Sequence, residues 1–143
     1  MILVDANLLI YAHNEAAAEH AAARAWFEDA MSGSDRVGLP LNSILAFVRI
    51  VSNPIIVRHP VTPAEAWQRS RGWLQRPNVW IPHPGPNHSE ILTTLFADSR
   101  ITSRMVPDAH LAALAIEHGL TLCSTDGDFK KFPALRWVNP LGA

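Results

Sequence analysis

The residues of this chain that could do chemistry are acidic, and three of them follow predicted strands. Asp5 comes after the apolar run of residues 2–4, and Asp126 and Asp128 come after the apolar run of residues 120–123. Strands that are joined through helices normally lie parallel, so their carboxyl ends share one edge of the sheet. Open α/β sheets usually hold their sites at that edge. We therefore expect these carboxylates to converge there.

Asp108 is expected to join them from the start of a helix. Leu111, Ala112 and Ala115 follow at spacings of three, four and seven residues, which places them with Asp108 on the apolar face of that helix. An ionised carboxylate on this face is unfavourable unless a cation or hydrogen-bond donors compensate it. Neighbouring carboxylates also repel each other unless a divalent cation holds them. Hard oxygen ligands suit Mg²⁺ or Mn²⁺, so the pattern predicts a divalent-metal site.

Each of these aspartates also has a local interpretation. Asp5 and Asp108 could cap the helices that follow them, and Asp126 and Asp128 could be turn residues. Taken one at a time, the local roles are reasonable. The joint placement of all four at one predicted sheet edge favours the metal site.

The elements that must position these residues alternate along the chain. Strands are expected at 1–4, 37–40, 79–81, 120–123 and 135–138, and helices at 6–11, 15–31, 42–51, 63–75, 87–98 and 108–118. This alternation is typical of an α/β fold with a small, mainly parallel sheet. We find no repeat, linker or low-complexity segment, and expect a single domain over residues 1–143.

Two of the predicted helices have features that the structure can test. Thr62, Pro63 and Glu65 form a capping-box start for the helix at 63–75. The helix at 15–31 has a stripe of mostly small apolar residues: Ala18, Ala22, Ala25, Trp26 and Ala30.

Charge is unevenly distributed although the net charge is only −1. Residues 1–35 carry −5, residues 36–89 carry +5 and residues 90–143 carry −1. The arginine-rich middle suits a polyanion or an acidic partner, and it equally suits a solvated helical surface.

Composition limits the remaining classes of protein. A hydrophobic content of 48% is ordinary for a globular protein. No apolar run approaches the roughly 20 residues that span a bilayer, and no signal peptide is evident, so we expect a cytoplasmic protein without a membrane partner. Cys123, the single cysteine, is expected to be a buried, inert thiol. The histidines lack metal-ligand spacing, and His110 and His118 are expected on a helix surface.

Four sequence blocks carry a family resemblance that covers nearly the whole chain. The blocks are Val4-Asp5-Ala6-Asn7, Phe47-Val48-Arg49 with Asn53-Pro54, Val106-Pro107-Asp108-Ala109-His110-Leu111-Ala112-Ala113-Leu114-Ala115, and Ser124-Thr125-Asp126-Gly127-Asp128-Phe129. In this order they resemble the PIN-domain ribonucleases, in particular the VapC toxins of bacterial toxin–antitoxin pairs. The resemblance implies a PIN-like α/β/α sandwich and a Mg²⁺-dependent endoribonuclease. It also implies a homodimer whose toxicity is blocked by a VapB-type antitoxin.

The resemblance also implies roles for individual residues. Asp5, Asp108 and Asp126 match the family's catalytic, metal-binding acids, and Asp128 matches a further acid that is either a ligand or a neighbour of one. A cation held there, Mg²⁺ or in its place Mn²⁺, would activate water and polarise an RNA phosphate. Asn7, Ser124 and Thr125 could orient ligands or water. The candidates for contacts with RNA phosphates are Arg49, Arg100, Arg104, Lys130 and Lys131.

One position departs from the family pattern. The family usually has a glutamate in the third helix, just before a step that here reads Phe47-Val48-Arg49, and this chain has Ala46. The loss leaves fewer negative charges for a metal, so weaker binding or a single-metal site is our hypothesis. The alternative function is a catalytically weak or inactive PIN-like module that binds RNA or protein.

Overall fold

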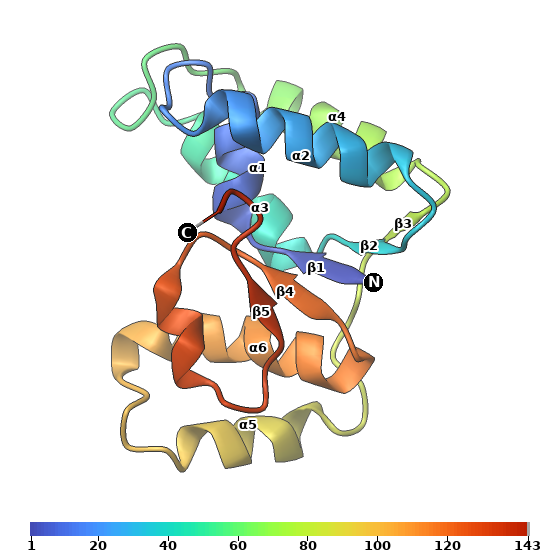
Figure 1. The fold of residues 1–143 in the computed structure, drawn as a ribbon. Coiled ribbons are helices and arrows are strands. Elements are labelled where there is room, and N and C mark those ends of the chain that lie inside the picture. The colour runs from blue at the N-terminus through green and yellow to red at the C-terminus, as the bar shows by residue number, and fades with distance from the viewer. Residues whose placement is uncertain (143) are drawn as a thin grey trace.

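The computed structural model describes residues 1–142 and has a five-stranded, all-parallel sheet at its centre (Figure 1). The strands lie in the order β3–β2–β1–β4–β5, and their bounds are β1 (Ile2–Val4), β2 (Val37–Gly38), β3 (Val79–Trp80), β4 (Thr121–Cys123) and β5 (Trp137–Val138). Each strand lies inside a predicted range and is shorter than predicted. The small parallel sheet is therefore confirmed.

The strand order reverses at β1. From β1 the chain adds β2 and β3 on one side, and β4 and β5 are added on the other. Val4 at the end of β1 pairs with Cys123 at the end of β4, and the Asp5 N–H donates to the Cys123 carbonyl at 3.0 Å. Asp5 and Ser124 therefore leave the sheet side by side. In open parallel sheets a crevice for ligands forms at such a reversal.

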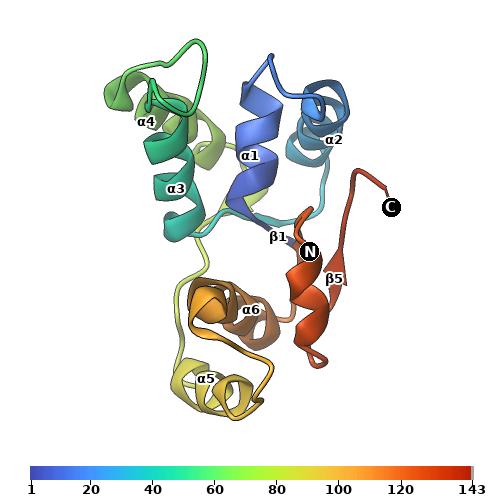
Figure 2. The same ribbon diagram turned by 90° about the vertical axis from the view of Figure 1, so that its left-hand side faces the viewer.

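Helices cover both faces of the sheet (Figures 1 and 2). One layer consists of α1 (Ala6–His13), α2 (His20–Ser32), α3 (Leu41–Val51) and α4 (Pro63–Leu74), and the other of α5 (His88–Phe96) and α6 (Val106–His118). This arrangement is the α/β/α sandwich that the family resemblance implied.

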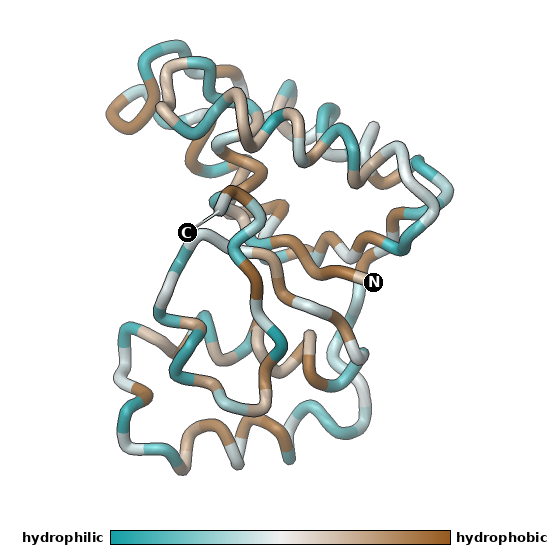
Figure 3. The backbone as a smooth tube through the Cα atoms, in the orientation of Figure 1, coloured by the Kyte–Doolittle hydropathy of each residue, from teal (hydrophilic) through white to brown (hydrophobic). Residues whose placement is uncertain are grey.

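Each face of the sheet has its own hydrophobic core, because successive strand residues point to opposite faces. Val4 and Cys123 pack among the helices α1–α4, whereas Leu3 and Leu122 pack with α5 and α6. Figure 3 shows apolar residues along the central strands and hydrophilic ones along the outer turns. The loop after α3 differs from the other outer segments because it is apolar, and its residue Ile55 is 92% exposed.

The second helix differs from its prediction. It begins at His20 rather than Glu15, because the preceding residues form a turn in which the Asn14 side chain accepts a hydrogen bond from the Ala16 N–H at 3.2 Å. Of the predicted stripe, Ala18, Ala22 and Ala25 are exposed, whereas Trp26 and Ala30 are half-buried and pack against the core. The fully buried residues of α2 are Ala23, Phe27 and Met31. The two large apolar side chains determine which face turns inward, because they bury more surface than alanines do.

The sixth helix begins two residues before its predicted start. A 3₁₀ turn, η1 (Ser103–Met105), leads directly into α6, and Pro107 occupies its first turn. Asp108 is in that first turn, and Met105 at the cap position has no side-chain capping bond. The interpretation of Asp108 as an N-cap was therefore wrong, whereas its expected neighbours Leu111, Ala112 and Ala115 are indeed buried.

The start of α4 agrees with its prediction. The Thr62 Oγ1 accepts a hydrogen bond from the Glu65 N–H at 3.1 Å, and Pro63 is the first helical residue. Across residues 1–142, no helix is long and apolar enough to cross a membrane.

Candidate active site

Three of the four predicted aspartates form a tight cluster at the carboxyl edge of the sheet. Asp108, Asp126 and Asp128 each offer a carboxylate oxygen, and these oxygens lie within 4.8 Å of one another. Asp108 comes from the first turn of α6, whereas the other two come from the loop and the 3₁₀ turn η2 (Gly127–Lys131) after β4. The prediction that carboxylates from separate elements converge at this edge is confirmed.

Asp5 lies beside this cluster and has its own hydrogen bonds. Its Oδ1 accepts from the Ala6 N–H at 2.8 Å, and its Oδ2 accepts from the Ser124 hydroxyl at 2.6 Å. Burial raises the pKa of Asp5, these two hydrogen bonds lower it, and the Asp126 charge raises it. Asp5 therefore caps α1, as its local interpretation suggested, and it also shares the electrostatic field of the cluster. Its role as a metal ligand stays a prediction.

Ser124 connects the aspartates of β1 and β4. It is fully buried, and its Oγ donates to Asp5 while it accepts from the Asn7 side-chain amide at 3.2 Å and from the Asp126 N–H at 3.0 Å. The Asn7 Oδ1 is also buried and has no hydrogen-bond partner among residues 1–142. Ser124 thus contacts Asp5 and Asp126 directly, and Asn7 reaches them through Ser124. Their role in orienting ligands or water stays a prediction.

The turn after β4 gives Asp126 a second function. Its Oδ1 accepts the Asp128 N–H at 2.9 Å, which makes Asp126 the cap of η2. This bond uses one carboxylate oxygen and holds Asp128 close to Asp126. The turn interpretation and the metal-site interpretation are therefore compatible. Thr125, between Ser124 and Asp126, is half-buried.

Asp108 is the aspartate of this site whose surroundings most disfavour the ionised carboxylate. Burial raises its pKa to about 6, with further contributions from the charges of Asp126, Asp5 and Asp128, and only Arg104 acts against them. No hydrogen bond is among the influences on this half-buried carboxylate. A divalent cation would supply the missing compensation. The donor set fits a hard metal ion, which Asp108, Asp126 and Asp128 could hold together.

The predicted phosphate-binding residues fall into two groups. Arg104 and Lys131 lie at the cluster, where the Arg104 Nη1 donates to Asp128 Oδ2 at 3.0 Å and the Lys131 Nζ is 3.7 Å from Asp128 Oδ1. Arg100 is instead bound to Asp98, at 2.7 Å and 3.1 Å.

The remaining two candidates lie away from these pairs. The Lys130 Nζ is 5.6 Å from the centre of the Trp137 ring, and Arg49 is exposed on α3. The ion pairs within residues 1–142 do not include Arg49. The structure thus places neither side chain in the acidic cluster.

Ala46 lies half-buried on α3, and no residue of that helix is acidic. The glutamate that the family usually has there is not replaced by a neighbour on the same helix. Among residues 1–142, the clustered carboxylates come from α6 and the segment after β4, and Asp5 directly follows β1.

The histidines include polar contacts that the sequence did not indicate. The His88 Nε2 and the His110 Nδ1 are 3.1 Å apart, and the His118 ring bonds the His83 carbonyl at 2.7 Å. His110 and His118 are half-buried, and neither is among the buried residues of α6. The expectation for Cys123 is confirmed, because it is buried and burial raises its pKa to about 12.

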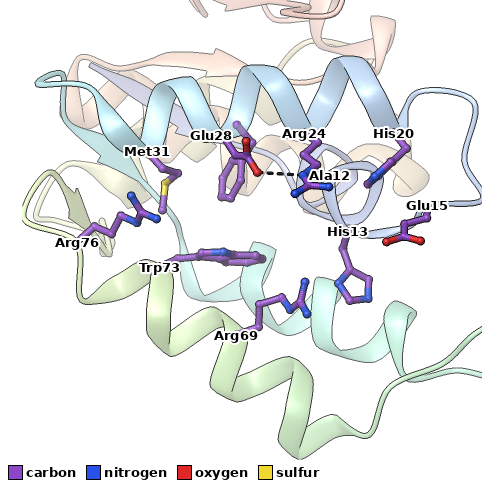
Figure 4. Close-up of a pocket in the computed structure, with 11 residues that line it drawn as sticks. Ala12, His13, Glu15, His20, Arg24, Glu28, Met31, Arg69, Trp73 and Arg76 are labelled. Atoms are coloured by element: carbon purple, nitrogen blue, oxygen red, sulfur yellow. Dashed lines mark hydrogen bonds and ion pairs between the residues drawn. The ribbon is translucent and has the colours of Figure 1, made fainter.

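A separate cleft of about 330 Å³ lies between α1, α2 and α4 (Figure 4). Phe27 and Trp73 contribute aromatic rings, and Arg69 of α4 and Arg76, which follows the end of α4, point into the cleft. None of its lining residues belongs to the acidic cluster. Among those residues the ion pair is that of Arg24 with Glu28, which leaves Arg69 and Arg76 available for another molecule.

Comparison with known proteins gives a consistent result for nearly the whole chain. Residues 2–135 match the PIN domain family. The chain is 36% identical to Ribonuclease VapC37 of Mycobacterium tuberculosis over 140 residues, which cover 98% of this chain and 97% of that protein. It is also 36% identical to Ribonuclease VapC33 of the same organism over 141 residues, or 99% of each chain.

Solved structures show the same fold at lower sequence identity. The structure of VapBC2 from Rickettsia felis bound to a promoter DNA fragment has a chain with a TM-score of 0.69 and 16% identity, covering 97% of this chain and 98% of that one. Mycobacterium tuberculosis VapC20, described as a toxin that cleaves the sarcin–ricin loop, has a TM-score of 0.66 and 17% identity, covering 91% and 93%.

Proposed function

The chain belongs to the PIN-domain family, within its VapC group, and we propose that it is a Mg²⁺-dependent endoribonuclease, the toxic component of a type II toxin–antitoxin pair. The observation that carries the proposal is the cluster of Asp108, Asp126 and Asp128 at the strand-order reversal. The names of the relatives support cleavage of RNA, and the carboxylate oxygens support a hard divalent cation.

The residues of the site would have different roles in phosphodiester hydrolysis. When bound, the cation would activate water and stabilise the leaving oxygen. Asp108, Asp126 and Asp5, with Asp128, would hold it, and Mn²⁺ would substitute for Mg²⁺ because both prefer oxygen ligands. Ser124 keeps Asp5 in position through its 2.6 Å bond.

RNA would approach through its phosphates. Arg104 and Lys131 are exposed or half-exposed cations at the rim of the acidic cluster. Such contacts position a nucleic acid without selecting its bases. We assign Arg49 and Lys130 to the outer part of the same binding surface, and Arg100 a smaller share because Asp98 already binds it.

The proposal extends to a VapB-type antitoxin. Solved neighbours include complexes described as VapBC2 and as a toxin–antitoxin complex from Klebsiella pneumoniae. The cleft between α2 and α4 combines aromatic rings with arginines that lack acidic partners in the cleft, so it suits an amphipathic segment with acidic residues.

A homodimer and a cytoplasmic location complete the proposal. Leu41 and Leu45 are 41% and 51% exposed and lie one turn apart on α3, which supports contact with a second copy of this single-domain chain. A reduced compartment suits the buried free thiol of Cys123.

The test is cleavage of total cellular RNA by protein freed from any co-purifying partner. Parallel reactions contain Mg²⁺, Mn²⁺ or EDTA, with Asp5→Ala and Asp108→Asn as inactive variants and Asp98→Asn as a control acid outside the cluster. We expect discrete, metal-dependent products from the wild type and from Asp98→Asn only. Absence of cleavage with either metal, by a folded protein that still binds RNA, would contradict the nuclease and favour the alternative, a PIN-like binding module.

A further inference from the structure

Asp128 is the member of the aspartate cluster that positive side chains already hold. Arg104 donates to its Oδ2 at 3.0 Å, and the Lys131 Nζ lies 3.7 Å from its Oδ1. The ion pairs within residues 1–142 include neither Asp108 nor Asp126. Among the three clustered aspartates, Asp128 is therefore the one whose carboxylate forms ion pairs with basic side chains.

The Arg104 contact and a metal ion compete for the same group. A cation shared by the three aspartates would use Asp128 oxygens and would bring two positive charges next to the guanidinium, and like charges repel at such distances. The charge of such a cation would therefore weaken the attraction between Arg104 and Asp128.

The geometry allows Arg104 to leave. Its side chain is 72% exposed and donates one hydrogen bond to Asp128, and exposed ion pairs of this kind are weak. Arg100, four residues earlier, is different, because it binds Asp98 through two nitrogens and also contacts the Lys131 carbonyl at 3.4 Å. Two arginines of the same segment thus differ in how freely they can move.

We propose that Arg104 is an exchangeable counter-cation of the site. While the site holds no metal, Arg104 neutralises Asp128. When a metal binds Asp128, the guanidinium is released toward solvent at the rim of the site, where it binds a phosphate of the incoming RNA. The planar guanidinium suits such a contact because it can donate two parallel hydrogen bonds to phosphate oxygens. This inference rests on the proposed function, because it requires Asp128 to be a metal ligand.

The proposal predicts an effect that a structural anchor would not produce. If Arg104 competes with the metal, its removal must tighten metal binding. If Arg104 merely holds Asp128 in a ligating position, its removal must weaken metal binding. The direction of the change therefore separates the two roles without any measurement of cleavage.

The first experiment is a titration of metal-free protein with Mn²⁺, with free Mn²⁺ measured by electron paramagnetic resonance. We expect the Kd of Arg104→Ala to fall about fivefold below that of the wild type, because one nearby positive charge is removed. Arg104→Lys retains the charge and should stay close to the wild type. Arg100→Ala is the matched control, since it removes an exposed arginine of the same segment, and its Kd should not change.

The second experiment follows the arginine itself. Addition of Mg²⁺ to ¹⁵N-labelled wild-type protein should shift the Nε–Hε resonance of Arg104, assigned through Arg104→Lys, and leave that of Arg100 in place. An unchanged or higher Mn²⁺ Kd in Arg104→Ala, or an equal fall in Arg100→Ala, would overturn the exchange. The proposed function fails separately, and the exchange with it, if the wild type shows no saturable Mn²⁺ binding that Asp126→Asn abolishes.

Discussion

The Ser124 hydroxyl donates a 2.6 Å hydrogen bond to the Asp5 carboxylate and thereby joins residues 119 positions apart in the chain. Both residues directly follow strands that pair in register, so this bond sets the distance between the two halves of the acidic edge. Because Ser124 is fully buried, water cannot replace it.

Ser124→Ala should therefore destabilise the protein and reduce its activity. The change leaves the Asn7 amide, the Asp126 N–H and one Asp5 oxygen without their partner, and each such loss costs about 1–3 kcal/mol. Urea unfolding and RNA cleavage measure the two effects. Ser32→Ala is the control, because it removes a hydroxyl that bonds the Glu28 carbonyl on the exposed side of α2, and it should change stability by no more than about 0.5 kcal/mol. Equal stability of both variants would contradict the role of Ser124.

The stability of the metal-free protein should fall as the pH rises toward neutrality. Burial, then the neighbouring carboxylates, raise the pKa of Asp108 from 3.8 to about 6, and burial also raises the pKa of Asp5. At pH values between these two pKa values of Asp108, the folded protein binds more protons than the unfolded chain. The stability that comes from this difference is therefore fully present at low pH and is lost as the pH rises past about 6. Thermal unfolding across this range measures it.

Two comparisons test the assignment of that pH dependence. Asp108→Asn should flatten the fall in stability, whereas Asp98→Asn should not, because the pKa of Asp98 is lowered to about 2 by its bonds to Arg100. Added Mg²⁺ should stabilise the wild type more at neutral pH than at about pH 5, because protons compete with metal for the same carboxylate. A stabilisation by Mg²⁺ that is independent of pH would argue against Asp108 as a ligand.

Ala46→Glu should lower the metal concentration needed for half-maximal cleavage. No residue of α3 is acidic, and a carboxylate at this position would restore the charge that the family usually has. One added charge near the metal should change that concentration by about threefold to tenfold. Gln68→Glu is the control, because it adds one carboxylate at an exposed position of another helix, α4. A similar change in both variants would indicate a general effect of charge.

Reversing the charge of the cleft should weaken the antitoxin complex while RNA cleavage by the free protein persists. Arg69→Glu with Arg76→Glu places two carboxylates in the cleft between α2 and α4, and we expect the Kd for the co-expressed antitoxin to rise at least about tenfold. Arg71→Glu reverses an exposed arginine on the same helix that does not line the cleft, and it should bind normally. Unchanged affinity in the double variant would place the antitoxin elsewhere.

The sequence by itself determined the elements and the acids of the site. Apolar runs ending at Asp5 and before Asp126 predicted parallel strands, and parallel connections bring the carboxyl ends of strands to one edge. The face of α6 that carries Asp108 followed from the apolar spacing behind it. The capping residues of α4 were also predictable, since a cap depends on side chains within one helical turn.

Only the tertiary structure decided which long-range partners these residues have. Arg100 and Arg104 belong to the same segment, yet one binds its near neighbour Asp98 and the other reaches Asp128 across the site. The residues of α2 that face the core depend on how its large side chains pack against neighbouring helices. The spacing of the alanines therefore did not predict that face. The cleft and the pairing of His88 with His110 also arise between elements distant in the chain. Local periodicity determines an element and its faces, whereas contacts between elements depend on how they pack together.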